Sequence, residues 1–282
     1  MFDRVVIGID GYEAGEDAIA LAKALLSGDG EVTLVYVEVL QSKPAPEADT
    51  RPGDEERRFG LERLGRLRDE GQIAAEISRI QAASVRRGLH EFAAAQDADL
   101  LVIGAGRHDP VAHMFLGDEA RDLLEDPPCP VAVAPAGYSK HPGQLRKIGV
   151  AYDGSPESDR AFALARKLTV EHHATLSAFE GVRAPVYARD VWNVEGEIDA
   201  DVEKARQRIA ALGDVEAHAE FADEAVAGLR RYGASVDLLV VGAHRHRPVD
   251  RLVERSTSQR LADEPPCPLL VLAPAARDGS DG

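Results

Sequence analysis

The stretch "ADLLVIGAGRHDPV" at residues 98–111 returns as "VDLLVVGAHRHRPV" at residues 236–249. Each copy joins a nearly continuous apolar run, typical of a strand buried on both faces, to a loop that begins Gly-Ala-x-Arg-His-x-Pro-Val. Two more segment pairs match: "RVVIGIDG" at 4–11 with "KIGVAYDG" at 147–154, and "EDPPCPVAVAPA" at 125–136 with "DEPPCPLLVLAPA" at 263–275. The chain is therefore an internal duplication.

Strand-like and helical patterns alternate within each copy. Copy one predicts strands at 4–10, 31–40, 72–79, 98–105 and 130–135, with helices near 16–27, 55–70, 84–96 and 112–124. Copy two predicts strands near 147–153, 174–180, 214–221, 236–242 and 268–273, with helices near 157–169, 197–212, 223–232 and 249–262. Alternating strands and helices indicate an α/β fold: two tandem doubly wound domains, each with a five-stranded parallel sheet.

The length of 282 residues suits two such domains. We place them at residues 1–140 and 145–276, joined by "GYSKHPGQLR" at 137–146 and followed by a short tail at 277–282.

Composition and charge exclude several classes of partner. The formal net charge of −16 repels nucleic-acid phosphates and anionic membranes. The start "MFDRVVIGID" lacks the basic and apolar regions of a signal peptide, and no apolar run approaches the length of a membrane span. We expect a cytoplasmic protein that binds neither nucleic acid nor membrane.

The two cysteines, Cys129 and Cys267, lie in identical "PPCP" contexts just before an apolar strand. This pattern favours small buried residues at a strand entrance over a redox or disulfide role.

The unusual residues of each copy follow its strands. In doubly wound sheets, ligands bind beyond the carboxyl ends of the strands, where the strand order reverses. Asp10 and Asp153 end the first strands, and the Gly-Ala-x-Arg segments end the fourth. The long connections at 41–54 and 181–196 could cover the same edge as lids or interaction surfaces.

These residues resemble the universal stress protein family in its tandem form, over nearly the whole chain. The resemblance rests on Asp10-Gly11 and Asp153-Gly154-Ser155-Pro156, on the glycine-led loops after the fourth strands, and on the "PPCPVAVAP" and "PPCPLLVLAP" segments. It implies an adenine nucleotide alpha hydrolase-like fold with strand order 3-2-1-4-5, a stress-related role, and pairing of domains through their last strands. A tandem chain could form that pair within one molecule, and a homodimer of such chains is left open.

Members of this family that bind ATP carry Gly-x2-Gly-x9-Gly-Ser/Thr after the fourth strand, because glycines let backbone amides approach phosphate and the hydroxyl adds a donor. Copy one matches with Gly104 and Gly117, but has Arg107 and Asp118 at the other two positions. Copy two matches with Gly242 and Ser256, but has Arg245 and Arg255 at the others. The Asp118 carboxylate would repel phosphate, so copy two is the better candidate site.

Arginines can replace the lost amides, because a guanidinium offers several donors to phosphate. Arg245, Arg247 and Arg255 are candidates for that role, and the alternative is that they are solvated or pair with Asp250 and Glu254. Asp10 and Asp153 resemble the family residue near adenine or ribose, and an aspartate before glycine is equally a turn former or helix cap.

The remaining unusual residues give weaker indications of function. His108, His244 and His246 have no neighbours at metal-ligand spacing, so we expect no metal site. Trp192 is expected to anchor its loop, and no catalytic motif stands out.

These features are compatible with three alternative functions. The first is a stress-response protein acting as a nucleotide-responsive module that binds ATP with Mg²⁺ in copy two. The second is a nucleotide-independent scaffold that binds an unidentified protein through degenerate loops. The third, ATP hydrolysis or phosphotransfer, has only fold analogy behind it.

Overall fold

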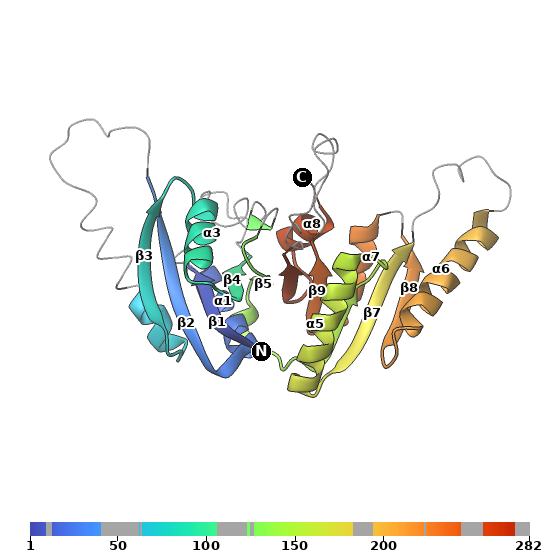
Figure 1. Cartoon of the computed structure of the whole chain (residues 1–282), viewed down its shortest axis with the longest axis horizontal. Coiled ribbons are helices and arrows are strands. Elements are labelled where there is room, and N and C mark those ends of the chain that lie inside the picture. Colours follow the sequence, from blue (N-terminus) through green and yellow to red (C-terminus); the bar gives the residue numbers. More distant parts are fainter. Residues whose placement is uncertain are drawn as a thin grey trace, which may run out of the picture. The chain divides into compact units, whose positions relative to one another are not determined.

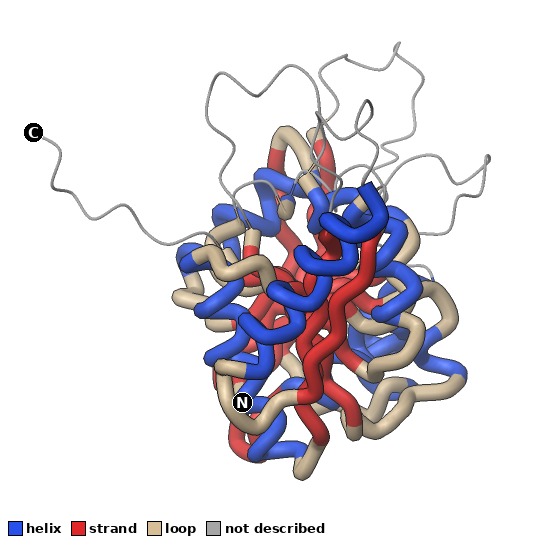
Figure 2. The backbone as a smooth tube through the Cα atoms, turned by 90° about the vertical axis from the view of Figure 1, so that its right-hand side faces the viewer, coloured by secondary structure: helices blue, strands red, loops and turns tan. Residues whose placement is uncertain are grey.

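The computed structural model divides into two compact units, one comprising Met1–Leu123 and Pro127–Pro142, the other Leu124–Asp126 and Gly143–Gly282. It describes residues 1–9, 13–40, 62, 64–105, 123–124, 127–182, 194–222, 224–243 and 256–273. In these parts, strands alternate with helices along the chain and lie between them (Figures 1 and 2). The predicted α/β architecture is confirmed.

The first unit contains strands β1 (Phe2–Gly8), β2 (Leu26–Val39), β3 (Glu76–Ala82), β4 (Leu100–Gly104) and β5 (Val131–Ala134). Its helices are α1 (Glu13–Leu25), α3 (Val85–Ala95) and the short 3-10 helix η1 (Tyr138–Lys140). The strands pair in the order β3-β2-β1-β4-β5, and the pairs β1–β2, β1–β4, β2–β3 and β4–β5 are parallel.

The second unit repeats this plan with β6 (Lys147–Ala151), β7 (Thr175–Val182), β8 (Glu216–Phe221), β9 (Leu238–Gly242) and β10 (Leu269–Leu272). Its helices are α5 (Pro156–His172), α6 (Val194–Ala210), α7 (Ala225–Gly233) and α8 (Thr257–Asp263). The order β8-β7-β6-β9-β10 is again 3-2-1-4-5, with parallel pairing between neighbours.

Helices cover both faces of each sheet. In the second unit, Phe179 packs on Tyr232 of α7, whereas Glu180, the next residue of β7, contacts Arg208 of α6. Successive residues of a strand point to opposite faces, so α6 and α7 cover opposite faces of this sheet. Burial on both faces explains why the central strands are apolar throughout: all five residues of β4 are buried.

Element boundaries differ from the sequence prediction in several places. The strand predicted at 72–79 lies at Glu76–Ala82, because residues 71 and 72 still form a turn, with Gln72 at φ 49°. Strand β2 begins at Leu26, directly after α1, so the helix predicted at 16–27 ends two residues earlier, at Leu25, and it begins three residues earlier, at Glu13. The helix predicted at 112–124 lies almost wholly outside the described residues, as does the first part of the one predicted at 249–262.

The segment after β5 is anchored rather than free. Asp17 of α1 is 3% exposed, and its carboxylate accepts hydrogen bonds from the backbone amides of Gly137 and Ser139, each at 2.7 Å. Gly137 has φ 84°, the left-handed region that glycine adopts without strain. The start of the predicted linker is therefore part of the first unit.

Candidate functional site

The strand order of the second unit reverses between β6 and β9. From β6 the chain crosses to β7 on one side, whereas β9 pairs with the other side of β6, Ile148 opposite Leu238 and Val150 opposite Val240. The carboxyl ends of such adjacent strands border the crevice in which doubly wound proteins hold ligands. Asp153 and Gly242 follow or end these two strands, as the sequence predicts.

Asp153 closes the turn between β6 and α5. Its Oδ1 accepts a hydrogen bond from the backbone N–H of Ser155 at 3.0 Å, and Gly154 between them has φ 78°. Its carbonyl oxygen lies 3.5 Å from Nη1 of Arg208 on α6. Of the two interpretations left open by the sequence, the turn-forming one has direct contacts in the structure.

The amino-terminal end of α5 is already capped. Ser155 accepts the N–H of Ser158 at 3.1 Å, Pro156 occupies the first turn, and Glu157 and Asp159 add two carboxylates there. These acids complement the positive end of the helix and would repel a phosphate. An anion in this crevice would therefore have to be held from the β9 side.

Gly242, at the end of β9, is required for packing. A Cβ added to it would lie 2.6 Å from the carbonyl oxygen of Glu157, in the first turn of α5. Gly104 is placed alike in the first unit, where a Cβ would lie 2.2 Å from the carbonyl oxygen of Ala14. Real Cβ atoms do not approach a carbonyl this closely, so both glycines let a helix backbone contact the end of the fourth strand.

Ser256 begins α8. Its Oγ accepts the backbone N–H of Gln259 at 3.2 Å, and the Gln259 side chain accepts the Ser256 N–H at 3.0 Å, a capping box. The Oγ also lies 3.0 Å from the Ser258 hydroxyl. The hydroxyl expected near a phosphate is thus engaged in helix capping.

Two polar pairs near these residues were missed by the sequence analysis. Tyr152 donates its hydroxyl to Asp159 at 2.7 Å, and burial together with that carboxylate raises the pKa of Tyr152 to about 12. Glu180 lies 3.5 Å from Arg208, and burial raises the pKa of Glu180, although the guanidinium opposes the shift. The only sequence signal for the first pair is that Tyr152 replaces the apolar Ile9 of copy one.

Five of the nine predicted site residues lie outside the described part of the chain: Asp10, Arg107, Gly117, Arg245 and Arg255. The same holds for Asp118, Trp192, the three loop histidines, and Arg247, Asp250 and Glu254. Of the others, Asp153, Gly242 and Ser256 belong to the second unit and Gly104 to the first. Among described residues, no group of three His, Cys, Asp or Glu could hold a metal ion. No described helix is long and apolar enough to cross a membrane.

Both cysteines are free and buried, each 6% exposed. Burial, with the nearby Asp99 charge, raises the pKa of Cys129 to about 12, and burial raises the pKa of Cys267 to about 12. The nucleophilic thiolate is therefore scarce at neutral pH, which argues against a redox role.

We expect Ellman's reagent at pH 8 to label neither cysteine of the native protein, and both after unfolding in guanidinium chloride. Native labelling should be slower by roughly 100-fold or more, because reaction needs an exposed thiolate. Rapid native labelling of either residue would contradict this burial, and single Cys→Ala variants would show which thiol had reacted.

The fold and the geometry at the strand ends define a tandem doubly wound α/β protein. Comparison with known proteins agrees: the pattern of the universal stress protein family matches residues 1–135 and again 144–273. The chain belongs to the universal stress protein family, with two domains in tandem, as the sequence resemblance predicts.

Individual relatives are distant. A Thermus aquaticus protein described as "Universal stress protein in QAH/OAS sulfhydrylase 3'region" is 29% identical over 136 residues, which cover 46% of this chain and 97% of the relative. A universal stress protein from Archaeoglobus fulgidus DSM 4304 covers 98% of both chains at 17% identity, with a TM-score of 0.67. A functionally unknown protein from Pseudomonas aeruginosa PAO1 covers 97% of this chain and 93% of its own at 16% identity, with a TM-score of 0.62. These two structures support the fold.

Proposed function

We propose that the second unit is a nucleotide-binding module that holds ATP, as its Mg²⁺ complex, beyond the carboxyl ends of β6 and β9. The observation that carries the proposal is the reversal of strand order between these two strands, which marks the ligand crevice of a doubly wound sheet. Asp153 and Gly242 lie at the two strand ends, and Ser256 opens the helix that leads to β10.

The second unit is preferred to the first because of charge. Copy one has Asp118 where copy two has the hydroxyl of Ser256, and a carboxylate opposes phosphate. The carboxylates at the start of α5 disfavour a phosphate on that side of the crevice, which supports phosphate contacts from the β9 side, where the arginine-rich segment follows the strand. Arg245 and Arg255 are therefore assigned the phosphate contacts, Asp153 a contact to the nucleoside, and nucleotide binding is the stress-responsive signal.

The test is a calorimetric titration of nucleotide-stripped protein with Mg-ATP at physiological salt. We expect one site per chain, with affinity about 10-fold or more weaker in Arg245→Ala and in Arg255→Ala, because a hydrogen bond to a charged group contributes about 1.5–3 kcal/mol. Arg107→Ala, the equivalent change in copy one, is the matched control and should leave the affinity unchanged. Two sites, or equal affinity in all variants, would refute the assignment.

A second candidate is a nucleotide-independent scaffold that binds a protein partner. It is favoured by the contacts of Asp153, Gly242 and Ser256, because turn formation, helix packing and helix capping account for all three residue types without a ligand. No heat of binding, with a melting midpoint unchanged by Mg-ATP, would select this function. A submillimolar affinity for ATP would exclude it.

A further inference from the structure

The free edge of the second sheet lies along β8, which pairs only with β7 in the described structure. The N–H of Ala222 is bonded to Val182 of β7, and backbone groups on a strand alternate in direction. The N–H and C=O groups of Ala217, Ala219 and Phe221 therefore point away from β7, along the open edge. Unpaired backbone of this kind is a template for another strand.

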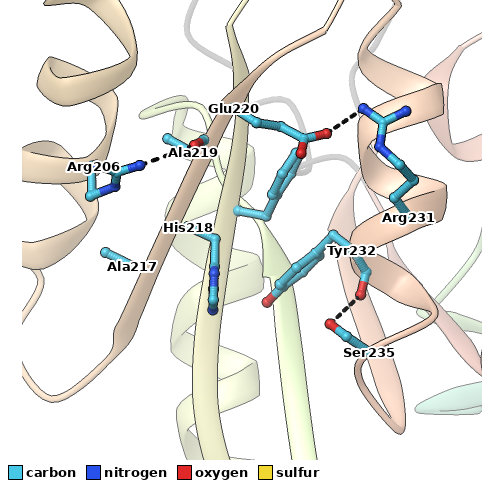
Figure 3. Close-up of a pocket in the computed structure, with 9 residues that line it drawn as sticks. Arg206, Ala217, His218, Ala219, Glu220, Arg231, Tyr232 and Ser235 are labelled. Carbon is cyan, nitrogen blue, oxygen red and sulfur yellow. Dashed lines mark hydrogen bonds and ion pairs between the residues drawn. The ribbon is translucent and has the colours of Figure 1, made fainter. Parts of the chain in front are cut away.

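A cavity of about 310 Å³ surrounds this edge. Its lining includes Ala217 and Ala219 on the α6 side of the strand, and His218 and Glu220 on the α7 side. Figure 3 shows Arg206 on one flank of β8, with Tyr232 and Arg231 on the other. Helix α7 packs mainly against β7 and α8, and it reaches β8 through two side chains: Arg231 is ion-paired with Glu220, and the Tyr232 ring lies 5.6 Å from that of His218.

The corresponding edge of the first unit is protected. Glu76 and Glu216 start the two edge strands, so Arg79, three residues on, corresponds to Ala219. Arg79 is ion-paired with Glu38 across β2 and β3. A charged residue in the middle of an edge strand deters pairing with a second strand, and a small one does not. In β8 the equivalent position holds the small Ala219, which is 8% exposed and whose carbonyl oxygen accepts a long hydrogen bond from Arg206.

We propose that two copies of this chain associate through their β8 edges, running antiparallel about a two-fold axis at Ala219. In that register Ala219 faces Ala219 of the second copy, and Ala217 faces Phe221. All three outward residues of each strand would then exchange N–H···O=C bonds, because hydrogen-bonded pairs alternate along an antiparallel ladder. Two-fold pairing requires a surface that is complementary to itself.

The side chains of β8 meet that requirement. On the α7 face, His218 of one copy lies opposite Glu220 of the other, in the closer, non-hydrogen-bonded pairing. Opposite or complementary polar pairs at such positions stabilise a sheet. On the α6 face, Phe221, a large apolar side chain that is 37% exposed, lies opposite the small Ala217. The edge thus pairs a bulky residue with a small one at both ends.

One backbone contact must be released, whereas His218 and Glu220 already have partners within the chain, Glu216 at 3.2 Å and Arg231 respectively. Arg206 of α6 donates to the carbonyl oxygen of Ala219 at 3.5 Å, a long bond, and also pairs with Glu203 at 3.1 Å. Strand pairing replaces the long bond with a backbone bond and leaves the Glu203 pair in place. The net charge of −16 opposes association, and that repulsion is screened at physiological salt.

The register gives a cross-linking test with a built-in control. In an Ala219→Cys variant of the full chain, the two new thiols lie about 5.5 Å apart between Cα atoms, within disulfide range, so mild oxidation should yield a covalent dimer. In Ala217→Cys the equivalent thiols are four residues out of register, about 14 Å apart, and should cross-link at least ~10-fold less. The native cysteines are buried, and oxidised wild type sets the background.

Analytical ultracentrifugation of the unmodified chain completes the test. We expect a dimer at chain concentrations of tens of micromolar. In Ala219→Arg, which introduces the residue type found at Arg79 of β3, the dissociation constant should be at least ~10-fold higher. Circular dichroism must show that the variants are folded. A wild-type chain that stays monomeric at 100 µM, a dimer that Ala219→Cys does not trap, or equal cross-linking through Ala217→Cys would overturn the proposal. Each of these results is independent of nucleotide.

Discussion

Replacing Gly104 with alanine is expected to lower the free energy of unfolding of the first unit by about 3 kcal/mol, at the upper end of the cost of overpacking. The added Cβ would lie 2.2 Å from the carbonyl oxygen of Ala14 and 2.8 Å from its Cβ. Neither the strand end nor the first turn of α1 can move without breaking the contact between them. Gly242→Ala should act in the same way on the second unit, where the Glu157 carbonyl oxygen is 2.6 Å away.

The measurement is urea unfolding followed by circular dichroism, in the absence of nucleotide. Gly143→Ala is the matched control, because a Cβ there meets nothing within 4 Å, and it should change stability by less than about 0.5 kcal/mol. Unchanged unfolding of Gly104→Ala would show that the helix and strand separate at little cost. The experiment also bears on the nucleotide hypothesis. Because Gly242→Ala destabilises the second unit, a loss of ATP binding in this variant would not by itself show that Gly242 contacts phosphate.

The second large effect is expected at Asp17. Asp17→Ala removes the acceptor of two charge-assisted hydrogen bonds, from Gly137 and Ser139, and should cost about 3 kcal/mol, since such bonds contribute about 1.5–3 kcal/mol and a buried unpaired donor adds a penalty. Asp17→Asn keeps one acceptor oxygen in place and should cost roughly half as much.

Thermal unfolding of the two Asp17 variants, compared with Glu16→Ala, provides the measurement. Glu16 is exposed on the same helix, so its replacement should change stability by less than about 0.5 kcal/mol. We expect the Asp17→Ala variant to be the least stable, the Asp17→Asn variant to be intermediate and the wild type to be the most stable. Equal stability of all three would mean that water replaces the carboxylate at these amides, and that the segment after β5 does not depend on α1.

In the candidate site, the positions of the residues could be predicted from the sequence, but their contacts could not. The positions of Asp153 and Gly242 at adjacent strand ends were predictable, because the parallel α/β pattern brings carboxyl ends to one edge of a sheet. Their contacts were not. The closest approach to Gly242 comes from Glu157, 85 positions earlier in the chain. The two residues meet because β6 and β9 are neighbouring strands, and no local sequence pattern encodes that packing.

The same distinction holds for the sheet edges. The sequence shows "EISR" in one copy and "EAHA" in the other without indicating that Arg79 and Ala219 occupy the same edge position. That follows from the register of β3 on β2 and of β8 on β7. The space beside β8 depends further on where α7 packs, which is decided by its contacts with β7 and α8.

The duplication, the alternation of strands and helices, the family and the charge follow from the amino-acid sequence, because periodicity and repeated motifs are local properties of the chain. The role of each glycine, cap and carboxylate depends instead on how the folded chain packs. Asp17 binds amides some 120 residues away, Gly242 admits a helix backbone, and Ala219 lies in the edge strand of the second sheet. These roles arise from close packing between distant segments, where a single methyl group or hydrogen bond determines which residue fits.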